Sequence, residues 1–127
     1  MAIINSVVSW LIKKRIHQID LFIKYPYDVQ VEWLRRLIYM AKDTEWGRRY
    51  KFRDIANYDA FRKRVPVSDY QQMKPFIDRL RQGEQNVLWP SDIRWFAKSS
   101  GTTSDKSKYI PVSQEALEEC HFKGGKD

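Results

Sequence analysis

The sequence of 127 residues is poor in cysteine, glycine and proline, and each shortage excludes a class of protein. Its one cysteine, Cys120, cannot form an internal disulfide, which excludes the disulfide-stapled secreted folds and favours the cytoplasm. Five glycines and five prolines are too few for a fibrous repeat or a disordered chain. The longest apolar stretch, residues 2–12, falls short of the ~20 residues that span a bilayer, so we expect no membrane partner.

The charge is unbalanced, with 23 Lys and Arg against 16 Asp and Glu and a formal net charge of +7. Residues 1–98 carry 19 of the basic residues and 11 of the acidic ones. The basic residues come in adjacent pairs and triplets, which point roughly 100° apart on a helix and form no single groove-reading face. We interpret them as solvated helix faces and expect no nucleic acid partner. A small basic helical module that binds nucleic acid is the alternative, and its binding would weaken steeply with salt.

Apolar periodicity predicts helices over the first three-quarters of the chain. Apolar residues recur every three or four positions from Ile4 to Ile23, which predicts an amphipathic helix packed on the core: Ile4, Val8, Ile12, Ile16, Ile19 and Ile23. A second helix is expected from Asp28, as N-cap, to Ala41. Further helical segments are expected at residues 43–50 (a short helix or turn), at 58–64, and after a Ser68 or Asp69 cap, with a kink or break at Pro75 and an end at Gly83.

The residue pattern changes after Gly83 from helical periodicity to short runs with strand character. Residues 93–98 and 108–112 have strand character and flank a polar stretch, and Ser113 is placed to cap a further helix. The predicted fold is therefore α/β and rich in helix: a helical N-terminal region over 1–92, then a β-hairpin and the start of a helix over 93–127. Because two strands alone make a marginal sheet, we expect both regions to be part of one larger domain with a remainder downstream.

The polar stretch between the two strands predicts a phosphate loop. Residues 99–104 contain five Ser or Thr hydroxyls and Gly101, and Lys106 and Lys108 follow. Glycine permits close backbone approach, successive N–H groups form an anion-binding nest, and lysine supplies compact positive charge for a polyphosphate. Composition alone also fits an ordinary polar hairpin connection.

A Walker A loop is excluded because its spacing, G-x-x-x-x-G-K-[ST], is not met. Gly101 is one residue too close to Lys106-Ser107, the second glycine is missing, and a strand rather than a helix follows. Other catalytic sets are weak too. Cys120 and His121 are adjacent on a predicted helix and diverge, so we expect a buried cysteine beside a surface histidine, and two histidines with one cysteine provide no metal-ligand set.

The ordered string Ser99-Ser-Gly-Thr-Thr-x-x-x-x-Lys108-Tyr-Ile-Pro resembles the ATP-phosphate loop of adenylate-forming enzymes. It resembles more specifically the auxin-responsive promoter family of acyl-acid amido synthetases. Three upstream segments are similar to the helical N-terminal region of that family: Val65-Pro-Val-Ser-Asp-Tyr70, Lys74-Pro-Phe-Ile77 and Gly83-Glu84. The resemblance covers roughly residues 28–120.

The resemblance implies an ATP-dependent ligase with the adenylate-forming fold. The family adenylates a carboxylic acid and transfers the acyl group to the amine of an amino acid, with Mg²⁺ on the phosphates. Carried over residue by residue, the ATP-phosphate contacts would be Ser99, Ser100, Gly101, Thr102, Thr103 and Lys108, with Lys106 as a possible assistant. No catalytic residue in the strict sense is assigned.

One position departs from the family pattern. Family members often carry a glycine shortly after the threonine pair, where this chain has Ser104-Asp105. The Asp105 carboxylate would repel ATP unless it points away or meets the metal. We expect the partners to be a small carboxylic acid, an amino acid and the remainder of a longer chain, with the 127 residues inactive alone. A third hypothesis, beside the synthetase and the nucleic-acid-binding module, is a truncated family member without catalysis. It is favoured if no coding sequence follows Asp127.

Overall fold

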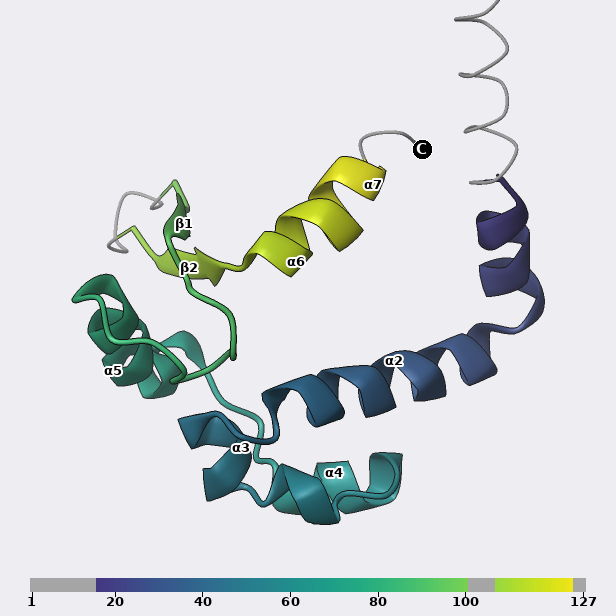
Figure 1. Cartoon of the computed structure of the whole chain (residues 1–127), viewed down its shortest axis with the longest axis horizontal. Coiled ribbons are helices and arrows are strands. Elements are labelled where there is room, and N and C mark those ends of the chain that lie inside the picture. Colours follow the sequence, from purple (N-terminus) through teal and green to yellow (C-terminus); the bar gives the residue numbers. More distant parts are fainter. Residues whose placement is uncertain (1–15, 101–106, 125–127) are drawn as a thin grey trace, which may run out of the picture.

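The computed structural model describes residues 16–100 and 107–124, and these are rich in helix with one two-stranded sheet. The elements are a helix over 16–24, α2 Pro26–Ala41, α3 Glu45–Arg49, the 3-10 turn η1 Phe52–Asp54, α4 Tyr58–Arg64, α5 Tyr70–Arg81, β1 Trp95–Lys98, β2 Tyr109–Val112, α6 Gln114–Ala116, the π-helical η2 Leu117–His121 and α7 Phe122–Gly124. Figure 1 shows α2 running across the molecule, with α5 and the hairpin beyond one of its ends. None of the described helices is long and apolar enough to cross a membrane.

The first two helices differ from the sequence expectation in detail. Helix α2 begins at Pro26 with Tyr25 as N-cap, so Asp28 lies inside the first turn and is not the cap. Proline suits this first position because its fixed φ is helical and its missing N–H has no intrahelical partner there. In the helix over 16–24, Ile16 is 51% and Ile23 74% exposed, so the expected packing of this helix on the core is wrong over the described residues. The two buried clusters are formed by residues from Ile38 onward.

Two short helices start where side-chain caps are available. Thr44 precedes α3, and its hydroxyl accepts a hydrogen bond from the Gly47 N–H at 2.9 Å. Asn57 precedes α4 and accepts from the Ala60 N–H at 2.9 Å. A capped N–H replaces one of the backbone partners that a first helical turn lacks. Both helices lie where the sequence predicts them, and the bounds of α4 agree with the prediction residue for residue.

Helix α5 is fixed at both ends. Asp69 forms a capping box with Gln72, and Gly83, at φ 98°, ends the helix in a Schellman motif, with Glu84 N–H donating to Arg79 C=O at 3.1 Å. The helix continues through Pro75, so a division into two helices is wrong. Pro75 removes only the hydrogen bond to the carbonyl of Gln71, four residues earlier. Because Gln71 is exposed, water can donate to that carbonyl instead.

The core of the described residues contains two small clusters that share a tryptophan. Ile38, Ala41 and Phe52 form the first, between α2 and η1, and Leu80, Val87 and Ile93 form the second, beside α5. Trp89 packs against both clusters. Its indole N–H also donates to the Glu115 carboxylate at 3.2 Å, which ties the last helical segment to the core. The segment around Trp89 thus connects the helical part of the chain to the hairpin and to α6.

The hairpin pairs β1 and β2 antiparallel, as predicted, with Trp95 opposite Val112 and Lys98 opposite Tyr109. After β2, Ser113 caps α6 by accepting from the Ala116 N–H at 3.1 Å, which confirms the predicted helix start. A π-helical segment, η2, comes next in the chain and was not foreseen.

Candidate functional site

The predicted phosphate loop falls partly within the described residues. Ser99, Ser100 and Lys108 are described, at the two ends of the motif; Gly101, Thr102, Thr103, Lys106 and Asp105 lie outside the described residues. Ser99 and Lys108 are half-buried and Ser100 is exposed. The described part of the candidate site is therefore its base, where the loop leaves β1 and enters β2.

Two hydrogen bonds join the ends of the motif. The Ser99 N–H donates to the Lys108 carbonyl at 2.9 Å, and the Lys108 N–H donates to the Ser99 hydroxyl oxygen at 3.1 Å. They extend the ladder one step beyond the last strand pair, Lys98 with Tyr109. A hydroxyl also carries one donor hydrogen of its own. Ser99 therefore closes the loop through its N–H and its hydroxyl oxygen, and its hydroxyl hydrogen can still donate to another group.

Helix α5 supports this base from the side of β2. The Tyr109 N–H, directly after Lys108, donates to the Tyr70 hydroxyl oxygen at 2.9 Å. At the other end of α5, the Arg81 guanidinium carbon lies 3.8 Å from the centroid of the Tyr109 ring. Contacts between α5 and β2 place the hairpin beside this helix, as Figure 1 shows. The base of the loop is thus held by a capped helix as well as by its partner strand.

Positive charge gathers at the base. The Lys108 ammonium lies 5.8 Å from the centroid of the Tyr70 ring, and the Lys98 ammonium 6.0 Å from that of Tyr109. With Arg81, three cationic side chains contact two tyrosine rings. Aromatic faces attract cations through the ring quadrupole, which allows like charges to be held near each other. Such a surface is suited to an anion with several negative oxygens.

Sequence reasoning did not identify Tyr70 and Arg81 as neighbours of the motif. A signal existed for Tyr70, because it ends the upstream segment Val65–Tyr70 that carries part of the family resemblance. Arg81 had no such signal. Both contacts depend on how α5 packs against β2, which residue spacing does not encode.

The remaining predictions about chemistry concern metal binding and the cysteine. Over residues 16–100 and 107–124, no group of three or more His, Cys, Asp or Glu is placed to hold a metal ion. Cys120 is exposed, so the expectation of a buried cysteine is wrong, and His121 beside it is exposed as expected. The π-helical turn η2 carries both residues, and it buries none of its members.

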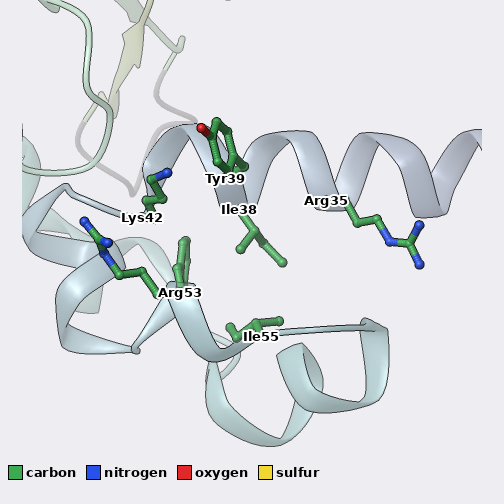
Figure 2. A pocket seen from close by; sticks show the side chains of 7 residues that line it. Arg35, Ile38, Tyr39, Lys42, Arg53 and Ile55 are labelled. Carbon is green, nitrogen blue, oxygen red and sulfur yellow. The ribbon is translucent and has the colours of Figure 1, made fainter.

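A concave surface away from the Ser99–Lys108 motif lies between α2 and η1. This pocket of about 450 Å³ is lined by Arg35, Ile38, Tyr39, Lys42, Phe52, Arg53 and Ile55. Figure 2 shows Ile38 and Ile55 facing each other across it, with Arg35 and Arg53 toward opposite ends. Arg53 is hydrogen-bonded to Asp43 through Nε at 3.1 Å, and the Lys42 ammonium lies 3.5 Å from the centroid of the Tyr39 ring. Two of its three cations are thus engaged within the fold, and no residue of the Ser99–Lys108 motif lines it.

Comparison with known proteins identifies the family. The model of the GH3 family N-terminal domain matches residues 15–126, which is most of the chain. The chain therefore belongs to the GH3 family, the auxin-responsive family of acyl-acid amido synthetases, and corresponds to its N-terminal portion. The predicted family membership is confirmed.

Individual curated relatives support the same family assignment. The chain is 36% identical over 96 residues to the probable indole-3-acetic acid-amido synthetase GH3.7 of Oryza sativa subsp. japonica, covering 70% of this chain and 16% of the relative. It is 31% identical over 91 residues to the probable indole-3-acetic acid-amido synthetase GH3.1 of Arabidopsis thaliana (71% and 15%). It is 32% identical over 91 residues to the jasmonoyl–L-amino acid synthetase GH3.3 of Oryza sativa subsp. japonica (71% and 20%). The chain thus matches only about a sixth to a fifth of these relatives' length.

Proposed function

We propose that this chain is the N-terminal part of an ATP-dependent acyl-acid amido synthetase with the adenylate-forming fold, and that residues 99–108 are its ATP-phosphate loop. The observation that carries the proposal is the pair of hydrogen bonds between Ser99 and Lys108, which joins the first and last residues of the proposed loop at one place. Family membership supports the reaction class, since the relatives named above are amido synthetases.

The proposed reaction has two steps. A carboxylate oxygen attacks the α-phosphorus of ATP, the bond to the β-phosphate oxygen breaks, and pyrophosphate leaves. The amine nitrogen of an amino acid then attacks the acyl carbon, AMP leaves, and the amine releases a proton. Adenylation gives the carboxylate a good leaving group, which makes a poor electrophile reactive.

The loop contributes electrostatic positioning in this proposal. Ser99, Ser100, Gly101, Thr102 and Thr103 contact the departing phosphates, Lys108 places a positive charge on them, and Lys106 assists. Donors that are fixed before the reaction stabilise developing charge without a reorganisation cost. The closed base of the hairpin supplies that fixation for Ser99 and Lys108. Mg²⁺ would be held by the substrate phosphates together with one or two carboxylates, and it would neutralise charge on the departing phosphates.

The products of the reaction test the proposal in the full-length protein that carries this chain. With a carboxylic acid, an amino acid and ATP, we expect one AMP and one pyrophosphate for each amide formed, and none without the acid. Formation of ADP and inorganic phosphate would contradict adenylation. A panel of aryl and alkyl carboxylic acids against the common amino acids identifies the substrates, and no amide with any pair would contradict the ligase assignment.

The 127 residues alone are proposed to be inactive, because the adenine, ribose and acyl pockets have no matching positions in them. Purified chain that formed amide from ATP, acid and amine would overturn this part. We also propose a cytoplasmic location, supported by the lone cysteine. Fractionation of cells that express the tagged full-length protein tests it, and recovery in the secreted fraction would contradict it.

A further inference from the structure

One side chain from the helical region reaches both the backbone and the charge at the end of the motif. The Tyr70 hydroxyl accepts the Tyr109 N–H at 2.9 Å, and the ring of Tyr70 lies 5.8 Å from the Lys108 ammonium. We propose that Tyr70 is a positioning residue that holds Lys108 in place for the polyphosphate of ATP. The inference rests on the proposed function of Lys108.

Three consecutive backbone groups around Lys108 are fixed. Its N–H donates to the Ser99 hydroxyl, its carbonyl accepts from the Ser99 N–H, and the next N–H, that of Tyr109, donates to Tyr70. The first two bonds come from Ser99, directly after β1, and the third comes from α5. A two-stranded ribbon is marginal by itself, so the bond to a separate helix decides how firmly this segment is held.

The backbone at Tyr70 is itself held by a capping box. Tyr70 is the first residue of α5, directly after Asp69, whose carboxylate accepts the Gln72 N–H at 2.8 Å while the Gln72 side chain accepts the Asp69 N–H at 2.9 Å. This capping box fixes the backbone at the place where the Tyr70 side chain leaves the helix. At the far end of α5, Arg81 lies over the Tyr109 ring. The segment Lys108-Tyr109 is thereby docked on one helix at two places.

The ring of Tyr70 acts on the charge itself. A ring face within about 6 Å attracts an ammonium as a whole and does not require one of its N–H bonds. An ammonium has three donors, and a polyphosphate offers many acceptors. Tyr70 therefore biases where the Lys108 charge lies in the absence of ATP. A tyrosine that only filled space would have neither the bond to Tyr109 nor this relation to Lys108.

Two variants separate the two contacts. Tyr70→Phe removes the hydroxyl and keeps the ring, and Tyr70→Leu removes both. Tyr58→Phe is the matched control, because Tyr58 is the first residue of α4 after the Asn57 cap and is 60% exposed. All are made in the full-length enzyme, together with Lys108→Ala and the Tyr70→Leu/Lys108→Ala double variant.

In acid-dependent ATP–pyrophosphate exchange, kcat/KM for ATP is expected to fall about 3- to 10-fold in Tyr70→Phe, the range that one hydrogen bond provides. It should fall further in Tyr70→Leu and stay unchanged in Tyr58→Phe. The KM for ATP should rise while the KM for the amino acid in amide synthesis stays unchanged, since a merely destabilised enzyme loses active protein and alters neither KM. Amide hydrogen exchange at Tyr109 should be about tenfold faster in Tyr70→Phe, which measures the contact itself without reference to activity.

The double variant distinguishes this inference from the function on which it rests. If Tyr70 acts through Lys108, Tyr70→Leu adds no further loss to Lys108→Ala; full additivity of the two losses would overturn the inference. Unchanged kcat/KM for ATP in both Tyr70 variants, with a large loss in Lys108→Ala, would also overturn it and leave the proposed function intact. Full activity of Lys108→Ala would overturn the role of the lysine, and the inference with it.

Discussion

Gly47 lies against the end of α2, so close that a β-carbon on it would be 2.0 Å from the carbonyl oxygen of Ala41. Two further backbone carbons, of Ala41 and Lys42, would be 2.9 Å away. The obstacle is backbone and cannot rotate aside as a side chain would. The close approach lets α3 fold back directly after α2, as Figure 1 shows.

Gly47→Ala is therefore expected to destabilise the protein by about 1–3 kcal/mol or more, the cost of overpacking a well-filled site. Gly124→Ala is the matched control, because a β-carbon there meets nothing within 4 Å. Denaturant unfolding followed by circular dichroism measures both. Equal stability of the two variants would contradict the close packing of α3 on α2.

Thr44 joins the same two helices by hydrogen bonds. It is completely buried, its hydroxyl donates to the Ala41 carbonyl at 2.7 Å, and the same oxygen accepts from the Gly47 N–H. Thr44→Val keeps the shape and loses both bonds, and we expect a loss of about 1–2 kcal/mol. Thr44→Ser keeps the hydroxyl and should recover most of that loss. If serine and valine were equally destabilising, the methyl group would contribute as much as the hydroxyl, which would contradict the prediction.

Arg79 binds two carboxylates and makes the stability of the fold depend on pH. It donates to both oxygens of Glu45, at 3.0 and 2.6 Å, and through Nε to Glu84 at 2.7 Å. These hydrogen bonds hold the pKa of both carboxyls below the ordinary value of 4.5. The folded state thus binds fewer protons than the unfolded state when the pH is near and below that value.

The contribution of this cluster is fully present above the unfolded pKa of about 4.5 and is lost as the pH falls through the lowered folded values. We expect the thermal midpoint to fall between about pH 5 and pH 3, and the fall to be smaller in Arg79→Gln, where the glutamates lose the cation. Calorimetry across that range, with Lys63→Gln as the control for an exposed charge on α4, measures the difference. Parallel profiles for the parent and Arg79→Gln would contradict the prediction.

The local features of the fold were readable from the sequence because their causes are local. Helix α4 follows a side-chain cap at Asn57 and ends before Pro66, and both signals are visible in the residue order. The strands of the hairpin were likewise predicted, because polar residues separate two apolar runs. The start of α2 was missed because Pro26 can open a helix without a side-chain cap, whereas Asp28 could only be judged as a capping residue type.

The contacts that organise the candidate site were not readable from the sequence. Tyr70 and Tyr109 are 39 residues apart, and their bond exists only because α5 packs beside β2. The burial of Ile16 and Ile23 was predicted wrongly for the same reason, since periodicity shows that a helix has an apolar face but not what that face contacts. The family motif could be read because it is a fixed order of residue types.

The central claim is that Lys108, joined to Ser99 at the base of the hairpin, acts on the phosphates of ATP. Acid-dependent ATP–pyrophosphate exchange by the full-length enzyme tests it most directly, with Lys108→Ala compared with Lys63→Ala. We predict that Lys108→Ala lowers kcat/KM for ATP about 100-fold, as expected for losing one fixed electrostatic partner of the departing phosphates, and that Lys63→Ala leaves it unchanged. Equal exchange rates in the two variants would contradict the claim.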